Sequence, residues 1–198
     1  MKRHLFAFFT AALVSAAAWA QTAPVEVVKQ AVVSTVDAMK LDPGARGGDM
    51  AKITQIVQTH FLPATNFDRT ARIAVGSAWK QATPAQQQAL TEQFKVLMTR
   101  TYAASLAQLG TQDARFAFTQ QQASGNDALV MSTVSTPGDS QQVGYRLGKT
   151  DNQWKIYDID MSGAWLIQVY QDQFKAQLSQ GGIDGLIKFL VAHNARAQ

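Results

Sequence analysis

The chain has 198 residues and no cysteine, and its 18 Lys and Arg residues against 14 Asp and Glu residues give a net charge of +4. The absence of cysteine excludes disulfides, thiol catalysis and cysteine-rich metal sites. The basic residues are spread along the chain and do not cluster with aromatic residues, which argues against nucleic acid as a partner.

The first twenty residues have the pattern of a cleavable secretory signal. Lys2 and Arg3 precede an apolar stretch at residues 5–17, and Ala18-Trp19-Ala20 matches a cleavage site. This stretch is shorter than the roughly 20 apolar residues that span a bilayer, and no cysteine follows it that would carry a lipid anchor. We therefore expect residues 1–20 to be removed and residues 21–198 to form one soluble domain outside the cytoplasm.

Helical patterns fill the first half of that domain. Apolar residues at steps of three and four predict helices over Pro24–Leu41, from an Asp49 cap to Pro63, and over residues 66–75. Residues 42–44 (DPG) end the first helix, and residues 46–48 form a loop. Thr83, Pro84 and Gln86 form a capping box with proline at the first helical position, which predicts a long helix that Gly110 ends.

After Gly110 the apolar period changes from about 3.6 to 2, which is typical of strands. We predict an antiparallel meander of four strands at residues 114–120, 127–135, 141–148 and 153–160. The helical period returns from Gly163, a break follows at Gly181-Gly182, and a last helix covers residues 183–191. Helices, then a sheet, then helices predict an α+β fold.

Few residues in the sequence suggest catalysis. His60 and His193 lie near predicted helix ends, where imidazole commonly interacts with terminal carbonyls. The usual hydrolase, metalloprotease and nucleotide-binding motifs do not occur. Asp158 and Asp160 share one strand face and offer an acid–base pair, but solvation at a strand end explains them equally well.

Two blocks of sequence match a known pattern. One comprises residues 79–87 (WKQATPAQQ), Phe94 and 99–103 (TRTYA), and the other 154–159 (WKIYDI), Gly163, 170–174 (YQDQF) and 181–187 (GGIDGLI). The first resembles the W-x-x-A-T-P-x-Q … F … R-T-Y-A signature of the MlaC family, also called toluene-tolerance proteins. The second resembles its W-K-V-Y-D-V … G … Y-R-x-Q-F … G-x-D-G-L-I pattern. The two blocks run from residue 79 to residue 187, and together with the signal and the chain length the resemblance extends over essentially all of residues 21–198.

The resemblance implies an NTF2-like cone, in which helices wrap a curved antiparallel sheet of about four strands around an apolar pocket. It implies a monomeric periplasmic carrier without catalytic residues, cofactor or metal. The pocket would take the tails of a diacyl glycerophospholipid and leave the headgroup outside. The implied partners are an inner-membrane ABC transporter complex with an MCE-domain protein and an outer-membrane lipoprotein bound to a porin, and the implied role is to maintain outer-membrane lipid asymmetry.

The apolar stripes and the implied fold together predict a set of lipid-binding residues. They are Trp79, Phe94, Met98, Tyr102, Leu106, Val130, Tyr145, Leu147, Trp154, Trp165 and Tyr170. Two positions depart from the family pattern: residues 164–166 (AWL) replace a frequent V-S-L and place an indole near the expected pocket wall, and Gln171 replaces a common Arg.

Two other functions are compatible with the sequence. Related cones host acid–base enzymes that act on small apolar substrates, and Asp158 with Tyr157 would then carry the chemistry. The aromatic residues would alternatively fill the core completely, which would leave an adaptor with protein partners only.

Overall fold

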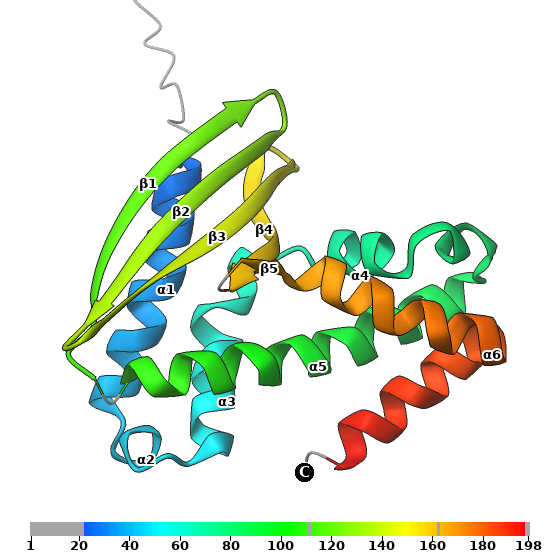
Figure 1. The fold of residues 1–198 in the computed structure, drawn as a ribbon, viewed down its shortest axis with the longest axis horizontal. Helices are drawn as coiled ribbons and strands as arrows, with labels where there is room; N and C mark the ends of the chain where they lie inside the picture. The colour runs from blue at the N-terminus through cyan, green and yellow to red at the C-terminus, as the bar shows by residue number, and fades with distance from the viewer. Residues whose placement is uncertain (1–21, 111, 162, 197–198) are drawn as a thin grey trace, which may run out of the picture.

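The computed structural model describes residues 22–110, 112–161 and 163–196, so the predicted signal sequence lies outside the described residues. Helices form its first part, drawn from blue to green in Figure 1. They are α1 (Pro24–Leu41), α2 (Pro43–Arg46), α3 (Met50–His60), η1 (Leu62–Ala64), α4 (Phe67–Val75), η2 (Gly76–Gln81) and α5 (Pro84–Gly110), where η marks a 3₁₀ helix. None of the described helices combines the length and apolar character needed to cross a membrane.

Local sequence signals begin these helices. The predicted capping box is confirmed, because the Thr83 N–H donates to Gln86 Oε1 at 2.9 Å and the Gln86 N–H donates to Thr83 Oγ1 at 3.3 Å. Asp49 caps α3 as predicted, and Asn66 caps α4 by accepting a hydrogen bond from the Arg69 N–H. Each cap satisfies a backbone N–H that the first helical turn leaves without a partner.

The segment after α1 differs from the sequence prediction. We expected residues 42–44 only to end α1 and residues 46–48 to form a loop, but the four residues from Pro43 to Arg46 form α2. The Asp42 side chain accepts a hydrogen bond from the Ala45 N–H at 2.8 Å, and Pro43 occupies the first helical position. The same Asp-Pro pair that ends α1 therefore starts a new helical turn.

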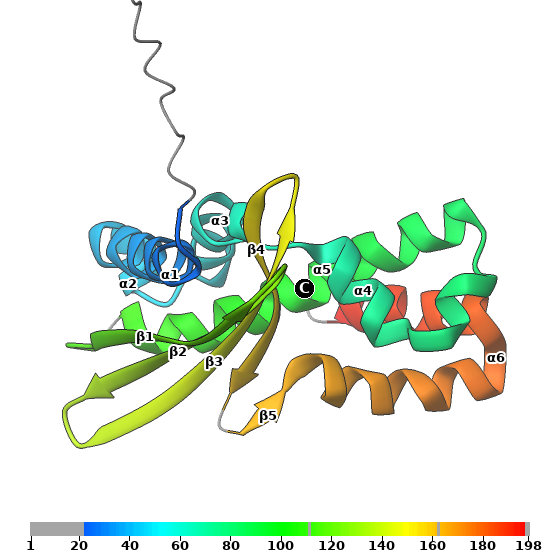
Figure 2. The ribbon, with the colours of Figure 1, turned by 90° about the horizontal axis from the view of Figure 1, so that it is seen from above.

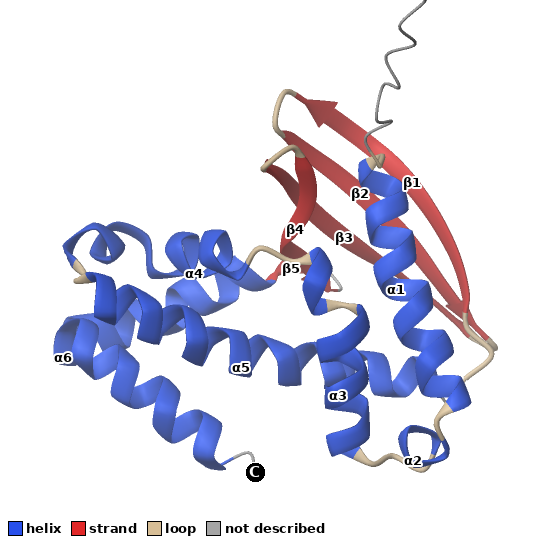
Figure 3. Ribbon diagram, turned by 180° about the vertical axis from the view of Figure 1, so that it is seen from behind, coloured by secondary structure: helices blue, strands red, loops and turns tan. Residues whose placement is uncertain are grey.

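The second part is a five-stranded antiparallel sheet in the order β1-β2-β3-β4-β5, which confirms the α+β class. Its strands are β1 (Arg115–Ser124), β2 (Asp127–Thr136), β3 (Asp139–Thr150), β4 (Gln153–Met161) and β5 (Ala164–Trp165). The first four are the predicted ones, each longer than expected, and β5 adds a two-residue pairing with β4. The sheet is curved, and α1 lies across one of its faces (Figures 1 and 3).

We call the face that α1 covers the inner face. Alternating residues point toward it, including Val130 of β2 and its cross-strand partner Tyr145 of β3. The register between β3 and β4 shifts at Arg146 and Leu147, so Tyr157 is an extra residue that has no partner in the pairing. Because of this bulge, Ile156 and Ile159 both face inward, and Asp158 faces outward opposite Arg146.

The last helix, α6 (Leu166–Arg196), bends at Gly182, which has φ 60° and ψ −157°. The predicted break at this glycine is therefore confirmed. The first arm of α6 lies along α5, where Phe94 meets Tyr170 and Phe174 in edge-to-face contacts with ring centroids 5.1 and 5.2 Å apart. Figure 2 shows α4 and α6 gathered beside one end of α5 and the sheet beside the other end.

Candidate functional site

A cavity of about 390 Å³ lies between the C-terminal half of α5 and the inner face of the sheet. This volume falls within the range of about 300–1,000 Å³ that small-molecule sites occupy. We call it the apolar cavity. Its walls come from α1, the residue that follows α3, α5 and the first four strands. They consist of Val32, Phe61, Tyr102, Ala104, Ser105, Leu106, Gln108, Leu109, Phe116, Val134, Gln141, Val143, Tyr145, Ile159 and Met161.

The described wall of the apolar cavity contains no charged side chain. Burial raises the pKa of Tyr145 to about 12, and burial followed by the nearby Asp158 charge raises the pKa of Tyr102 far above its usual range. Both phenols are therefore neutral at physiological pH. The Tyr145 hydroxyl lies 3.3 Å from Ser132 Oγ, and Ser105 Oγ donates to the Thr101 carbonyl at 2.9 Å. The cavity can bind an uncharged, apolar group without leaving these hydroxyls unsatisfied.

The sequence of α5 explains why this space is open. The N-terminal half of α5 buries Leu90 and Phe94 against neighbouring helices. Along the C-terminal half, the side chains that face the sheet include the short Ala104 and Ser105. Short side chains on one wall and a sheet that curves away from the other leave a gap that a close-packed core would have filled.

Three of the predicted lipid-binding residues, Tyr102, Leu106 and Tyr145, line the apolar cavity together. Four others lie within the buried core: Phe94, Met98, Val130 and Leu147. Tyr170 packs against Phe94, and its hydroxyl lies 3.2 Å from Thr101 Oγ1.

The three tryptophans that were predicted to bind lipid lie in separate parts of the structure. Trp79 borders a groove between η2 and α5, and Trp154 lies at a second, polar opening described below. Trp165 lies on the outer face of the sheet, where the Arg146 guanidinium stacks 3.8 Å from the centre of its ring. The departure at Gln171 replaces a cation with an amide that donates to the Ile73 carbonyl at 2.9 Å, which ties α6 to α4.

Sequence reasoning missed much of the cavity wall. The missed residues are Val32, Phe61, Ala104, Ser105, Gln108, Leu109, Phe116, Val134, Gln141, Val143, Ile159 and Met161. The alternation of side chains along the strands could have predicted some of them. Val143 lies two residues from Tyr145 on the same strand face, and Phe116 pairs with Val134 across β1 and β2. The position of the wall along each strand is set by α5, which the local pattern does not encode.

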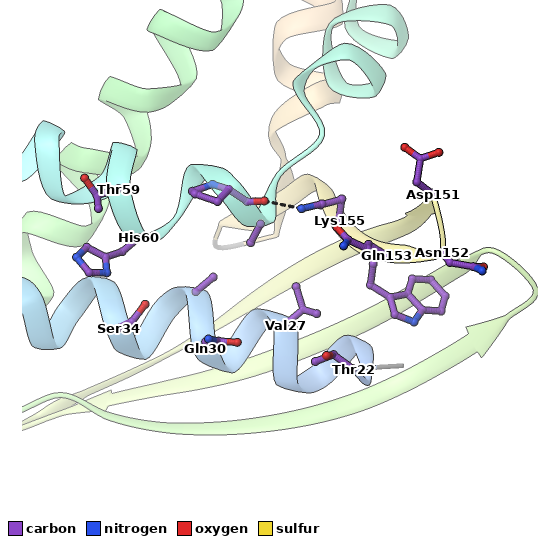
Figure 4. Close-up of a pocket in the computed structure, with 14 residues that line it drawn as sticks. Thr22, Val27, Gln30, Ser34, Thr59, His60, Asp151, Asn152, Gln153 and Lys155 are labelled. Atoms are coloured by element: carbon purple, nitrogen blue, oxygen red, sulfur yellow. Dashed lines mark hydrogen bonds between the residues drawn. The ribbon is translucent and has the colours of Figure 1, made fainter. Parts of the chain in front are cut away.

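A second opening, shown in Figure 4, is a cleft of about 880 Å³ between α1, the end of α3 and the turn that joins β3 to β4. We call it the polar cleft. Val27, Ala31, Ala64 and Trp154 give it apolar surface, and the side chains of Gln30, Ser34, His60 and Lys155 give it hydrogen-bonding groups. The Lys155 ammonium donates to the Pro63 carbonyl at 2.7 Å, as the dashed line in Figure 4 marks.

Asp158, the residue that an enzyme would use, holds the sheet and α6 together. Its carboxylate accepts hydrogen bonds from the Ile159 and Ile167 N–H groups at 3.0 Å and from Arg146 at 3.1 Å. Burial raises the pKa of Asp158, which these three hydrogen-bond donors partly oppose. Neither Asp158 nor Tyr157 is among the described residues that line the apolar cavity. Within the described residues, no three His, Asp or Glu side chains gather as a metal site.

The curved sheet, the long helix and the uncharged cavity between them define an α+β protein that has room for an apolar ligand. The family model for the MlaC protein matches residues 29–192. The chain belongs to the MlaC family, as its motifs predicted.

Two relatives add detail. A phospholipid-binding protein from Ralstonia solanacearum, solved in complex with a phospholipid, is 39% identical and superposes with a TM-score of 0.81, covering 88% of this chain and 98% of that chain. The intermembrane phospholipid transport system binding protein MlaC of Haemophilus influenzae is 23% identical over 182 residues, which cover 90% of this chain and 85% of that protein. Both relatives are described as phospholipid-binding or transport proteins.

Proposed function

We propose that this protein is a periplasmic phospholipid carrier. Residues 1–20 direct export and are removed, and residues 21–198 form the single lipid-binding domain. The apolar cavity takes acyl chain, and the headgroup lies outside it in contact with water. The carrier receives or delivers lipid at an inner-membrane ABC transporter complex with an MCE-domain protein and at an outer-membrane lipoprotein–porin complex, and so maintains outer-membrane lipid asymmetry.

The observation that carries this proposal is the uncharged apolar cavity between α5 and the inner face of the sheet. The 39% identical relative with a bound phospholipid supports the choice of ligand. The H. influenzae relative, which belongs to an intermembrane transport system, supports the role between two membranes. The two membrane complexes themselves follow from the family alone.

Hydrophobic burial supplies enough affinity for such a ligand. Each buried methylene contributes roughly 0.8 kcal/mol, so ten of them contribute about 8 kcal/mol, which corresponds to micromolar binding. No contact with the headgroup is needed to reach this value. An acyl chain is insoluble in water once it leaves a membrane, so its transfer requires a water-soluble carrier.

A carrier agrees with the position of the acidic residues better than an enzyme does. Catalysis on a small apolar substrate requires an acid or base within hydrogen-bond reach of the ligand. Asp158 instead faces the outer side of the sheet, and its carboxylate is already bonded to Arg146 and to the start of α6. The relatives are likewise phospholipid-binding and transport proteins.

The test is mass spectrometry of lipids extracted from the protein purified from periplasm. We expect phospholipid in the wild type and a lower occupancy in Leu106→Trp, because the indole would fill part of the apolar cavity. Val96→Trp is the matched control, since Val96 lies on the same helix and is 39% exposed. Circular dichroism would show that both variants are folded.

Each result bears on a separate part of the proposal. A folded wild type without lipid would contradict the carrier and favour an adaptor with protein partners only. Unchanged occupancy in folded Leu106→Trp would contradict the placement of the acyl chain. An equal loss in Val96→Trp would show that the effect of Leu106→Trp is not local to the cavity.

A further inference from the structure

The apolar cavity and the polar cleft are neighbours that share one thin wall. Ala31 lines the cleft and Val32, the next residue of α1, lines the cavity. His60 lines the cleft and Phe61, the next residue of the chain, lines the cavity. At these two points the two spaces are bounded by consecutive residues of the chain, which we call the wall.

The wall itself is built from apolar side chains. Phe61 is 2% exposed and meets the ring of Tyr102 edge-on, with centroids 5.2 Å apart. Tyr102 lines the same cavity, so the Phe61–Tyr102 contact lies on the cavity side of the wall.

The two spaces differ in chemistry. Among the described residues that line them, basic side chains occur only in the polar cleft, where His60 and Lys155 lie. Lys155 is half-buried, and one of its three N–H donors is bonded to Pro63, three residues after His60. This bond holds the ammonium against η1, the short helix that follows Phe61. In Figure 4 the Asp151 carboxylate, on the β3–β4 turn, points away from the α1 side of the cleft.

We propose that the polar cleft holds the phosphate-bearing headgroup of the lipid whose tail fills the apolar cavity. This inference rests on the proposed function. The acyl chain of the ligand passes the wall of Val32 and Phe61, and its phosphate lies at the Lys155 ammonium. The headgroup stays in contact with water, because the cleft is open to solvent, but it gains charge-assisted hydrogen bonds that the cavity wall does not offer.

The other end of the apolar cavity is a weaker place for a phosphate. Gln108 and Gln141, the exposed polar residues of the cavity wall on α5 and β3, carry amides and no positive charge. A phosphate diester carries a full negative charge, and hydrogen bonds from a cation to an anion are roughly twice as strong as neutral ones. An amphipathic ligand therefore matches the pair of spaces in one orientation, with its headgroup in the polar cleft.

The test compares two ligands that have the same tails, phosphatidylglycerol and diacylglycerol, offered together in vesicles and measured by native mass spectrometry. We expect the wild type to prefer the phospholipid, and Lys155→Gln to reduce that preference by about tenfold or more, the effect of one charge-assisted hydrogen bond. Gln30→Trp, which blocks the cleft from α1, should lower phospholipid occupancy. Lys29→Trp is its matched control, since Lys29 is the neighbouring exposed residue and lines neither space.

Three outcomes would overturn the cleft assignment. One is an unchanged ligand ratio in Lys155→Gln together with normal occupancy in Gln30→Trp. Another is an equal loss of occupancy in Lys29→Trp. A third is a shift of the Lys155 side-chain NMR signal by inorganic phosphate alone as large as that caused by phospholipid, which would assign the cleft to a free anion. A wild type that carries no phospholipid would instead contradict the proposed function.

Discussion

Asp158 is a buried carboxylate whose replacement separates a structural role from a catalytic one. Its side chain is 1% exposed and accepts hydrogen bonds from the Ile159 and Ile167 backbone and from Arg146. Ile167 lies in the first turn of α6, where backbone N–H groups have no partner within the helix. We predict that Asp158→Ala and Asp158→Asn will differ strongly in stability, although both remove the charge.

The size of the difference follows from the donors that each variant leaves unpaired. In Asp158→Ala two buried N–H groups lose their acceptor, and at about 1–3 kcal/mol each this lowers the unfolding free energy by about 2–6 kcal/mol. In Asp158→Asn the amide oxygen still accepts from both groups. Arg146 has a side chain that is 44% exposed and can return to water, so its lost pairing costs about 1 kcal/mol or less.

The pKa of Asp158 gives a second test. Burial raises this pKa in the folded state above the ordinary value of 3.8, so the folded protein binds the proton more tightly than the unfolded chain. The contribution of Asp158 to stability is therefore largest below the unfolded pKa and is lost as pH rises through the folded pKa. Asn has no such titration, so the stability of the wild type relative to Asp158→Asn should increase as pH is lowered toward 3.8.

Urea unfolding followed by tryptophan fluorescence measures both effects. Asp160→Ala is the matched control, because Asp160 lies on the same strand, is half-buried and accepts a single N–H bond, from Gly163 at 2.8 Å. The reasoning would be refuted if Asp158→Asn were as unstable as Asp158→Ala, or if the difference between wild type and Asp158→Asn did not change with pH. Lipid occupancy retained in Asp158→Asn would favour the carrier over the enzyme.

Two further substitutions test the fold and the site. Gly182→Ala should lower the unfolding free energy by about 1–3 kcal/mol, because a side chain at φ 60° is strained. Gly181→Ala, at the neighbouring position, should be neutral or slightly stabilising. Urea unfolding measures both, and equal effects of the two substitutions would contradict the prediction. Trp165→Leu should lose roughly 1 kcal/mol from the Arg146 stacking contact but keep wild-type lipid occupancy in extracts, and a large fall in occupancy would place Trp165 in the binding site.

Features that depend on near neighbours in the chain were predictable from the sequence. The reciprocal bonds of Thr83 and Gln86 join residues three apart, and the break at Gly182 requires a positive φ that glycine tolerates. Both were therefore visible as sequence patterns. The strands were also correct in number except for β5, which has only two residues and exists through its pairing with β4.

Features that depend on distant pairing were not predictable. Strict alternation would place Asp158 on the same face as Ile156, but the bulge at Tyr157 turns the carboxylate outward and Ile159 inward. This shift depends on how β4 pairs with β3, and the local sequence contains no sign of it. The outward direction of Asp158 favours a structural role over a catalytic one, and this argument required the structure.

The candidate site was only partly predictable for a related reason. One apolar stripe of α5 contains Phe94, Met98, Tyr102 and Leu106, and the sequence predicts the same role for all four. In the structure the first two are fully packed, while Tyr102 and Leu106 line the apolar cavity. What separates them is the first arm of α6, which packs on Phe94 through Tyr170 and Phe174. This contact joins segments of the chain that are far apart in sequence, so neither apolar stripe alone predicts it.

This division of α5 has a consequence for lipid transfer. A carrier must open its cavity to exchange lipid, and a cavity in the centre of the core would open only at the cost of the packing that holds the fold together. Here the aromatic contacts of Phe94 with Tyr170 and Phe174 lie at one end of α5, and the cavity wall of Tyr102 and Leu106 lies at the other. Movement of the sheet relative to the C-terminal half of α5 would widen the cavity while the helical end stays packed. In the proposed carrier, the long continuous helix therefore lets one part of the molecule provide stability while another part exchanges the ligand.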